Sequence, residues 1–177
     1  MTQELLEHRL PSLAPLEQRS FDPQAAIGAG LFAGAVYLGL DALLIPAFQG
    51  VSGWVPLRRI AAILLGPEAL TPPSEASAVI LALALLVHFT LSVSYAAIGG
   101  YLVHKVPTTS AVIAGCGLGA VLYVLNLHVL TYVFPFFADA RGWAAAFDHV
   151  VFGGVAALCY KALQVDREDW ERVFAPA

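Results

Sequence analysis

The sequence predicts an all-α membrane protein with four transmembrane helices and a short amphipathic or re-entrant helix between the first and second. Hydrophobic residues make up 59% of the 177 residues, and charged residues make up 12%. Soluble domains carry roughly 25% charged residues. The mean hydropathy is +0.75. A membrane-spanning helix needs about 20 mainly apolar residues, and four stretches of the sequence are long enough. The chain is therefore expected to lie in a lipid bilayer.

The four predicted spans follow one another along the chain, and each is bounded by helix-terminating or loop residues. They cover residues 24–48, 78–103, 110–134 and 143–163. Pro23 and Pro107 precede the first and third spans, where a missing amide hydrogen is tolerated, and Pro135 follows the third. Residues 1–23 and 164–177 are expected to be cytoplasmic tails. The first tail lacks the basic start and apolar run of a signal peptide.

A shorter apolar segment, residues 54–66, lies between the first two spans. Its apolar run, IAAILLG, is too short to cross a bilayer. Trp54, Arg58 and Arg59 at its start are typical of a helix at the membrane interface. The segment is expected to lie on the membrane or to dip into it, and the sequence leaves both arrangements open.

The Lys and Arg residues predict the orientation and exclude one class of partner. On the side that holds both termini and the second loop, there are six: Arg9, Arg19, Lys105, Lys161, Arg167 and Arg172. The other side has three: Arg58, Arg59 and Arg141. Basic loops stay in the cytoplasm, so both termini are expected there, in a bacterial inner membrane. The net charge of −4 excludes a nucleic-acid partner. The expected partners are lipids, further copies of the chain or other membrane subunits.

Each span carries small and polar residues on one face at helical spacing. The four sets are Gly30, Gly34, Tyr37 and Asp41; His88, Ser92, Tyr95 and Gly99; Gly115, Gly119, Leu122 and Asn126; and His149, Gly153, Ala156 and Tyr160. Helices in lipid approach one another most closely through small residues. The polar residues are therefore expected to point into the bundle.

Counting along the helices predicts that four of these polar residues lie at a similar depth. Asp41, His88, Asn126 and His149 lie about 9–15 Å from the non-cytoplasmic ends of their spans, at about 1.5 Å per residue. Ser92 and Tyr95 share the face of His88, at the i+4 and i+7 positions. These six residues form the predicted intramembrane polar site.

Two further polar residues, His128 and Asp148, are expected to point elsewhere. His128 is two positions from Asn126, a rotation of about 200°, so the two side chains cannot face the same way. Asp148 shares a bulkier face with Val151 and Val155. It is expected to turn toward the outer water or toward the loop that carries Arg141.

Three functional hypotheses follow from the polar site. Asp41, His88 and His149 could exchange protons or hold a cation or polar solute in a small transport or proton-relay protein, because histidine titrates near neutral pH. Alternatively, His88 and His149 could ligate a b-type haem or a metal ion, with Asp41 as a third metal ligand. In the third hypothesis the polar residues only fix the helix arrangement, and the chain is a structural or complex subunit without a cofactor.

The sequence gives no support for an enzymatic activity. The sequence contains no GxSxG, P-loop or dinucleotide-binding motif. The two cysteines, Cys116 and Cys159, form no CxxC pair and lie within apolar segments. The protein is therefore predicted not to be an enzyme.

Three segments resemble a family of small, uncharacterised four-span bacterial membrane proteins, some of which carry an automatic sodium:proline symporter label. The segments are PLRRIAAILLGPEAL at 56–70, LLVHFTLSVSYA around His88, and NLHVLTYVFPFFADARGWAAAFDHVVFG at 126–153. The resemblance covers residues 25–163 and implies four spans, with a role for Asn126, Arg141, Trp143, His88 and His149. His128 and Asp148 depart from the family pattern. Symporters of the labelled kind use inverted repeats of broken helices, and this chain has no internal repeat.

Overall fold

The structure, a computed structural model, describes residues 20–174, with side chains through residue 164. Regular structure in this part of the chain is all helical. Its elements are α2 (Pro23–Gln49), α3 (Trp54–Leu65), η2 (Pro67–Leu70), α4 (Ala78–Val103), α5 (Thr108–Val124), η3 (Leu125–Val129), η4 (Leu130–Tyr132), η5 (Pro135–Ala140) and α6 (Trp143–Phe174).

Four helical stretches are long and apolar enough to cross a membrane, which confirms the predicted fold class. They are Pro23–Gln49, Ala78–Val103, Thr108–Tyr132 and Trp143–Gln164. The short helix α3 lies between the first two, as predicted. Of the predicted tails, residues 1–19 and 175–177 lie outside the described part of the chain. Helix α6 continues beyond the predicted end of the fourth span, to Phe174.

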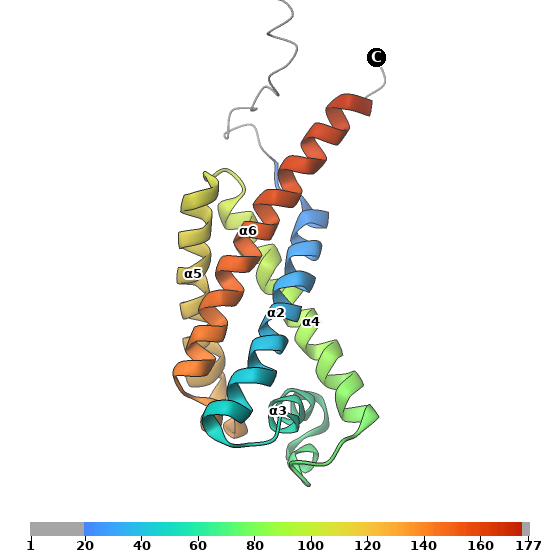
Figure 1. Cartoon of the computed structure of the whole chain (residues 1–177), viewed down its shortest axis with the longest axis vertical. Helices are drawn as coiled ribbons and strands as arrows, with labels where there is room; N and C mark the ends of the chain where they lie inside the picture. The colour runs from blue at the N-terminus through green and yellow to red at the C-terminus, as the bar shows by residue number, and fades with distance from the viewer. Residues whose placement is uncertain (1–19, 175–177) are drawn as a thin grey trace, which may run out of the picture.

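Helix α6 is the central element of the bundle. It packs against α5 on one side and against α2 on the other, and α4 packs against α2 (Figure 1). The start of α2 and the end of α6 lie at one end of the bundle, whereas α3 lies at the opposite end. In its most apolar stretch 56% of α6 is buried, against 17–28% in the other three spans. Helix α6 is therefore the most buried of the four spans.

Glycines at helical spacing allow the closest helix contacts. A Cβ atom added at Gly119 would overlap the backbone carbonyl of His149, and one added at Gly153 would overlap that of Gly115. Between α2 and α4, a Cβ at Gly30 would lie 2.6 Å from the Cα of Val93. The predicted small-residue faces are therefore the packing faces of these helix pairs.

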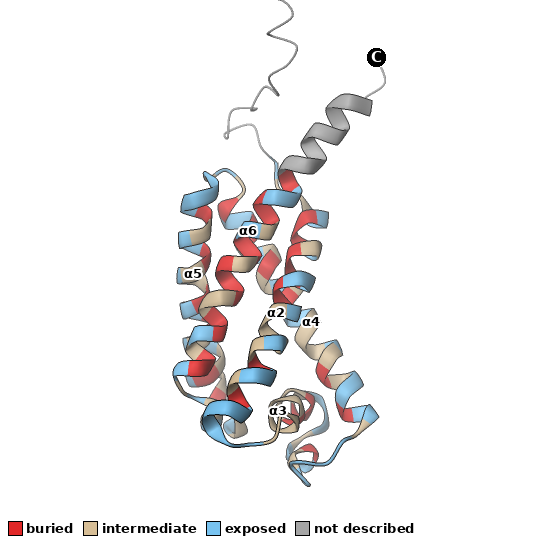
Figure 2. Cartoon of the chain, viewed as in Figure 1, coloured by how far each residue is buried: buried red, intermediate tan, exposed pale blue. Residues whose placement is uncertain are grey.

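Large apolar side chains cover the outward faces of the spans. The exposed residues lie along the outer sides of the helices (Figure 2), and they include Phe32, Leu43, Leu86 and Ile113. A soluble protein rarely exposes so continuous an apolar surface. These faces are suited to contact with lipid.

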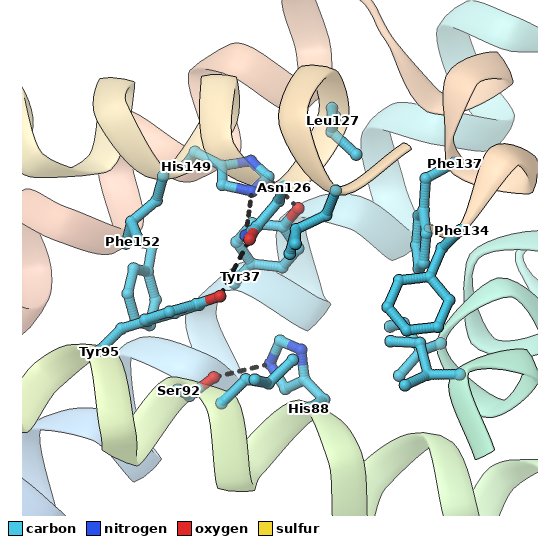
Figure 3. A pocket seen from close by; sticks show the side chains of 15 residues that line it. Tyr37, His88, Ser92, Tyr95, Asn126, Leu127, Phe134, Phe137, His149 and Phe152 are labelled. Atoms are coloured by element: carbon cyan, nitrogen blue, oxygen red, sulfur yellow. Dashed lines mark hydrogen bonds between the residues drawn. The ribbon is translucent and has the colours of Figure 1, made fainter. Parts of the chain in front are cut away.

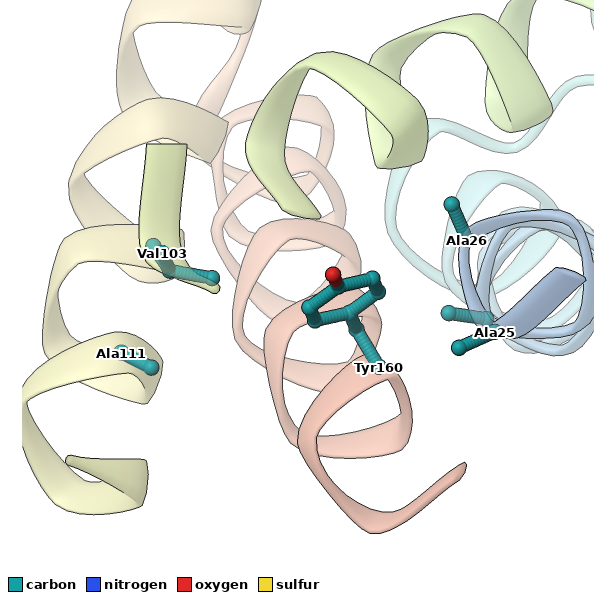
Figure 4. Packing of buried hydrophobic residues seen from close by; sticks show 6 residues of the cluster. Ala25, Ala26, Val103, Ala111 and Tyr160 are labelled. Carbon is teal, nitrogen blue, oxygen red and sulfur yellow. The ribbon is translucent and has the colours of Figure 1, made fainter. Parts of the chain in front are cut away.

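The end of the bundle that carries the start of α2 is tightly packed around Tyr160. The Tyr160 ring lies between Ala25 and Ala26 of α2 on one side and Val103 and Ala111 on the other (Figure 4). Its hydroxyl accepts a hydrogen bond from the backbone N–H of Asp22, at 3.1 Å. These contacts join the start of α2 and the α4–α5 connection to α6.

Helix α3 closes the other end of the bundle and packs mainly against α4. Ala61 and Ala62 of α3 share a buried cluster with Ile80 and Ala84 of α4. The buried Arg58 donates to the carbonyls of Ala69, at 2.8 Å, and Glu75, at 2.9 Å. Arg58 therefore ties α3 to the chain that leads into α4.

Candidate intramembrane binding cavity

The third span changes its helix type where it reaches the polar site. Helix α5 ends at Val124, and the chain continues as the π-helical turn η3 and then as the 3₁₀ turn η4. A π turn contains one extra residue per turn and is frequent at functional sites. Asn126 lies in this turn.

Arg141 stabilises the irregular end of the third span. Its Nε donates to the Leu127 carbonyl at 2.6 Å, and its Nη2 donates to the Thr131 hydroxyl at 2.9 Å. Thr131 in turn donates to the carbonyl of His128 at 2.8 Å. Carbonyls near a helix end lack partners within the helix, and Arg141 supplies a donor to one of them.

A cavity of about 210 Å³ lies beside η3 and is lined by 15 residues (Figure 3). Six of them are polar: Tyr37, His88, Ser92, Tyr95, Asn126 and His149. The other nine are apolar and include Ile60 and Ile63 of α3, Phe134 and Phe137. Five of the six residues of the predicted polar site therefore meet at one cavity, and Asp41 is the exception.

Hydrogen bonds around His149 connect all four spans. The Tyr95 hydroxyl donates to Oδ1 of Asn126 at 2.9 Å. Nδ2 of Asn126 lies 3.3 Å from Nε2 of His149. Nδ1 of His149 lies 2.7 Å from the carbonyl of Ala145 and 3.3 Å from the Tyr37 hydroxyl. Residues from α2, α4, η3 and α6 are thus joined in one network.

The partners assign the tautomer of His149. A carbonyl oxygen only accepts hydrogen bonds, so Nδ1 of His149 carries the hydrogen and donates to Ala145. Nε2 is then an acceptor, and the Asn126 amide donates to it. The arrangement satisfies both ring nitrogens of a neutral imidazole.

His88 is held by the neighbouring helix in a similar way. Its Nε2 lies 2.9 Å from the carbonyl of Gly34 and 3.3 Å from the Ser92 hydroxyl. Nε2 therefore donates to Gly34, and Nδ1 is left as an acceptor. The contact depends on the absence of a side chain at Gly34, where an added Cβ would lie 2.8 Å from the Ser92 hydroxyl oxygen.

The cavity has a polar side and an apolar side. Tyr95, Asn126 and His149 gather on one side, whereas Phe134 and Phe137 lie across the cavity from them (Figure 3). Among the described residues, the lining contains donors and acceptors but no Asp, Glu, Lys or Arg. Such a mixture suits an uncharged molecule that has both a polar group and an apolar body.

Asp41 and Asp148 lie apart from the cavity lining. Asp41 is 9% exposed and Asp148 is 0% exposed. The expectation that Asp148 turns toward the outer water is therefore wrong, and its carboxylate oxygens form no hydrogen bond with Arg141. Because α6 packs against helices on two sides, the face of Asp148 is buried as well as the face of His149.

The remaining predicted residues lie at the periphery. His128 is exposed, and its ring centroid lies 5.4 Å from that of Tyr123. Trp143 is 59% exposed, and its ring lies 4.8 Å from the ring of Phe48. Trp143 and Phe48 are placed as an aromatic pair at a membrane interface.

Tyr37 is a cavity residue that the sequence analysis left out of the predicted site. Its ring lies beside both imidazoles, with centroids 5.5 Å from His88 and 5.2 Å from His149. The signal was present in the sequence, because Tyr37 shares the small-residue face of Gly30 and Gly34.

The geometry does not fit a haem or metal ion between His88 and His149. Such an ion needs one free ring nitrogen from each histidine, at about 2.0–2.1 Å for zinc. Both nitrogens of His149 are engaged, and Tyr37 lies beside both rings. Among the described residues, no group of three or more His, Cys, Asp or Glu is placed to hold a metal. Asp41, His88 and His149 therefore do not form such a group.

Comparisons with family models, curated proteins and solved structures yield no match. The resemblance to small four-span bacterial proteins stays a prediction.

Proposed function

We propose that this small multi-pass membrane protein binds a small, uncharged, amphipathic solute in the intramembrane cavity, and that this binding serves transport of the solute. The cavity itself carries the proposal. It lies within the bundle, it is bounded by all four spans and α3, and its polar groups are concentrated on one side.

The volume limits the size of the solute. An engineered apolar cavity of about 150 Å³ takes up benzene. Typical small-molecule pockets measure about 300–1,000 Å³. At about 210 Å³, this cavity suits a molecule of about one substituted aromatic ring.

The hydrogen-bonding groups favour a neutral solute with a hydroxyl or amide. Nδ1 of His88 is available as an acceptor, and the hydroxyls of Ser92 and Tyr37 can donate or accept. A charged solute would lose its hydration without finding an opposite charge in the lining, and burial of an unpaired charge is costly.

A cavity-filling variant tests the proposal. Fluorophenol serves as the probe, and fluorine NMR of the protein in lipid nanodiscs reports the bound form. Ile63→Phe adds a ring to the cavity, whereas Leu64→Phe adds the same ring at a position that is 57% exposed. We expect at least tenfold weaker binding in Ile63→Phe and unchanged binding in Leu64→Phe. Equal binding by the wild type and Ile63→Phe, or no binding beyond empty nanodiscs, would overturn the proposal.

A second probe tests the polar side. Fluorobenzene fits the same space but cannot hydrogen-bond through a hydroxyl. One neutral hydrogen bond contributes about 0.5–1.5 kcal/mol, and 1.4 kcal/mol is about tenfold in affinity. We expect fluorophenol to bind about two- to tenfold more tightly, and this preference should disappear when His88 is changed to Phe.

A structural or complex subunit is the second candidate function. The observation that favours it is the network from Tyr95 through Asn126 and His149 to Tyr37, which links the spans without any ligand. Stoichiometric co-purification of another membrane protein, or a stable homo-oligomer in mild detergent, would support this candidate.

We also infer that the protein lies in a bacterial inner membrane with both termini in the cytoplasm. The contacts of Asp22 and His104 with α6 support a common side for the start of α2 and the second loop. With this orientation, the cavity and α3 lie in the outer half of the membrane.

A further inference from the structure

Asp148 is a buried acid that the cavity does not use. It lies five residues beyond the start of α6, about 8 Å into the span at about 1.5 Å per residue. Its side chain is 0% exposed. Neither carboxylate oxygen has a hydrogen-bond partner among the described residues. An acid in this position therefore needs an explanation of its own.

Burial without a partner decides the charge of Asp148. An ionised carboxylate that has lost its hydration needs a cation or several donors close by, and Asp148 has no donor. A neutral carboxylic acid loses far less hydration energy. The buried side chain is therefore a carboxylic acid that carries a proton.

A second acid acts on Asp148 from another helix. From α2, Asp41 interacts electrostatically with Asp148, and Tyr37 interacts with both acids. On α6 itself, the neighbouring His149 is neutral. From α5, the ring of Tyr123 lies 5.8 Å from that of His149.

Arg59 of α3 distinguishes the two acids. Its positive charge acts on the carboxyl group of Asp41. Burial lowers the pKa of the Arg59 guanidinium, while the negative charges of Asp139 and Asp41 raise it. An arginine remains charged under such opposing effects. Asp148 instead interacts with Asp41, and two carboxylates that are both ionised repel one another.

We propose that Asp148 is a proton-binding site of the membrane domain, which exchanges its proton with the outer water through Asp41. In the exchange, the O–H bond of Asp148 breaks and its proton passes to a water molecule, which gives up a proton to a carboxylate oxygen of Asp41, where a new O–H bond forms. Asp41 then releases the proton to water. Tyr37 links the two acids to the cavity, because it lines the cavity, interacts electrostatically with both acids and hydrogen-bonds to His149. The proposal does not rest on the identity of the cavity's solute.

A proton fits this site better than a metal cation. Hard cations such as Ca²⁺ take about six to eight oxygen ligands. The described residues supply no group of three or more acidic or metal-binding side chains here. A single carboxyl group holds a proton without further ligands.

Carbon-13 NMR of labelled aspartate tests the proposal on the full chain in lipid bilayers. The chain has six aspartates: Asp22, Asp41, Asp139, Asp148, Asp166 and Asp169. The carboxyl carbons of protonated and ionised aspartate have different resonances. At neutral pH we expect one protonated and five ionised aspartates. Asp148→Asn should remove the protonated resonance, whereas Asp139→Asn, at an exposed position, should leave it in place.

A conservative variant keeps the test valid if Asp148→Asn does not fold. Asp148→Glu retains an acid but removes the aspartate label, so the protonated aspartate resonance should vanish and labelled glutamate should show a protonated carboxyl. Six ionised aspartates in the wild type would overturn the proposal. So would a protonated resonance that survives in Asp148→Glu. Loss of the protonated resonance on addition of sodium or calcium would instead indicate a cation site.

Discussion

At the scale of single residues, Asn126 is suited to its position because its amide is both a donor and an acceptor. It accepts from the Tyr95 hydroxyl and donates to Nε2 of His149. A carboxylate at this position could accept from Tyr95 but could not donate to a neutral imidazole. A leucine could do neither. In lipid, no water replaces the lost partner.

Replacing Asn126 by leucine should therefore destabilise the folded protein. Tyr95 and His149 would each lose a partner, and we expect a loss of about 1–2 kcal/mol in the free energy of unfolding. Reversible unfolding in mixed micelles measures the change. Ser94→Ala is the control, because the exposed Ser94 bonds only to its own helix. If Tyr95→Phe and Asn126→Leu were strictly additive, the two residues would not be coupled.

At the scale of elements, the end of the third span depends on a residue outside it. The π turn η3 displaces the regular hydrogen-bonding pattern and brings Asn126 to the cavity, and Arg141 binds the Leu127 carbonyl from the following loop. A helix irregularity of this kind persists when other contacts offset its cost.

Arg141→Lys should loosen this end of the span while retaining the charge. Lysine lacks the planar fork that reaches Leu127 and Thr131 together. We expect faster hydrogen exchange at the backbone amides of residues 128–134, by about threefold to tenfold, and little change in α2. Lys105→Arg serves as a control at an exposed position of the opposite end. Unchanged hydrogen exchange in Arg141→Lys would mean that η3 is stable without the two guanidinium hydrogen bonds.

Two glycines of α5 allow a matched test of helix packing. A Cβ at Gly119 would overlap the carbonyl of His149, whereas a Cβ at Gly117 would meet nothing within 4 Å. Alanine favours a helix over glycine by about 0.8–1 kcal/mol. We therefore expect Gly117→Ala to be neutral or stabilising and Gly119→Ala to be destabilising by about 1–3 kcal/mol. Thermal unfolding in detergent separates the two, and equal effects would contradict the observed α5–α6 contact.

The sequence predicts the elements better than it predicts their irregularities. Long apolar runs identified the four spans, and helical spacing identified the glycine faces, because both signals are local. The π turn has no such signal, since it depends on Arg141 from another element. The burial of Asp148 was not predicted for a related reason. Its helix face also carries the bulky Val151 and Val155, and only the central position of α6 in the bundle buries that face.

At the scale of the whole molecule, the two ends of the bundle differ. Around Tyr160 the helices pack closely, with alanines on both sides of the ring. The other end contains the cavity and the covering helix α3. The two buried acids, Asp41 and Asp148, also lie in this half of the bundle. A solute or proton that enters from the α3 end meets these groups first. The side of the membrane that α3 faces therefore decides which compartment the site serves.

The proposed orientation predicts which positions react with a membrane-impermeant maleimide. Cys116 and Cys159 are first replaced by alanine, and single cysteines are then introduced by Glu75→Cys or Lys105→Cys, both at exposed positions. Glu75 lies just before α4 at the α3 end, and Lys105 lies in the α4–α5 connection at the opposite end. Because basic loops remain in the cytoplasm, intact bacterial cells with a permeabilised outer membrane should label Glu75→Cys. Lys105→Cys should react only after the inner membrane is opened. The reverse pattern would place the cavity and the two buried acids on the cytoplasmic side.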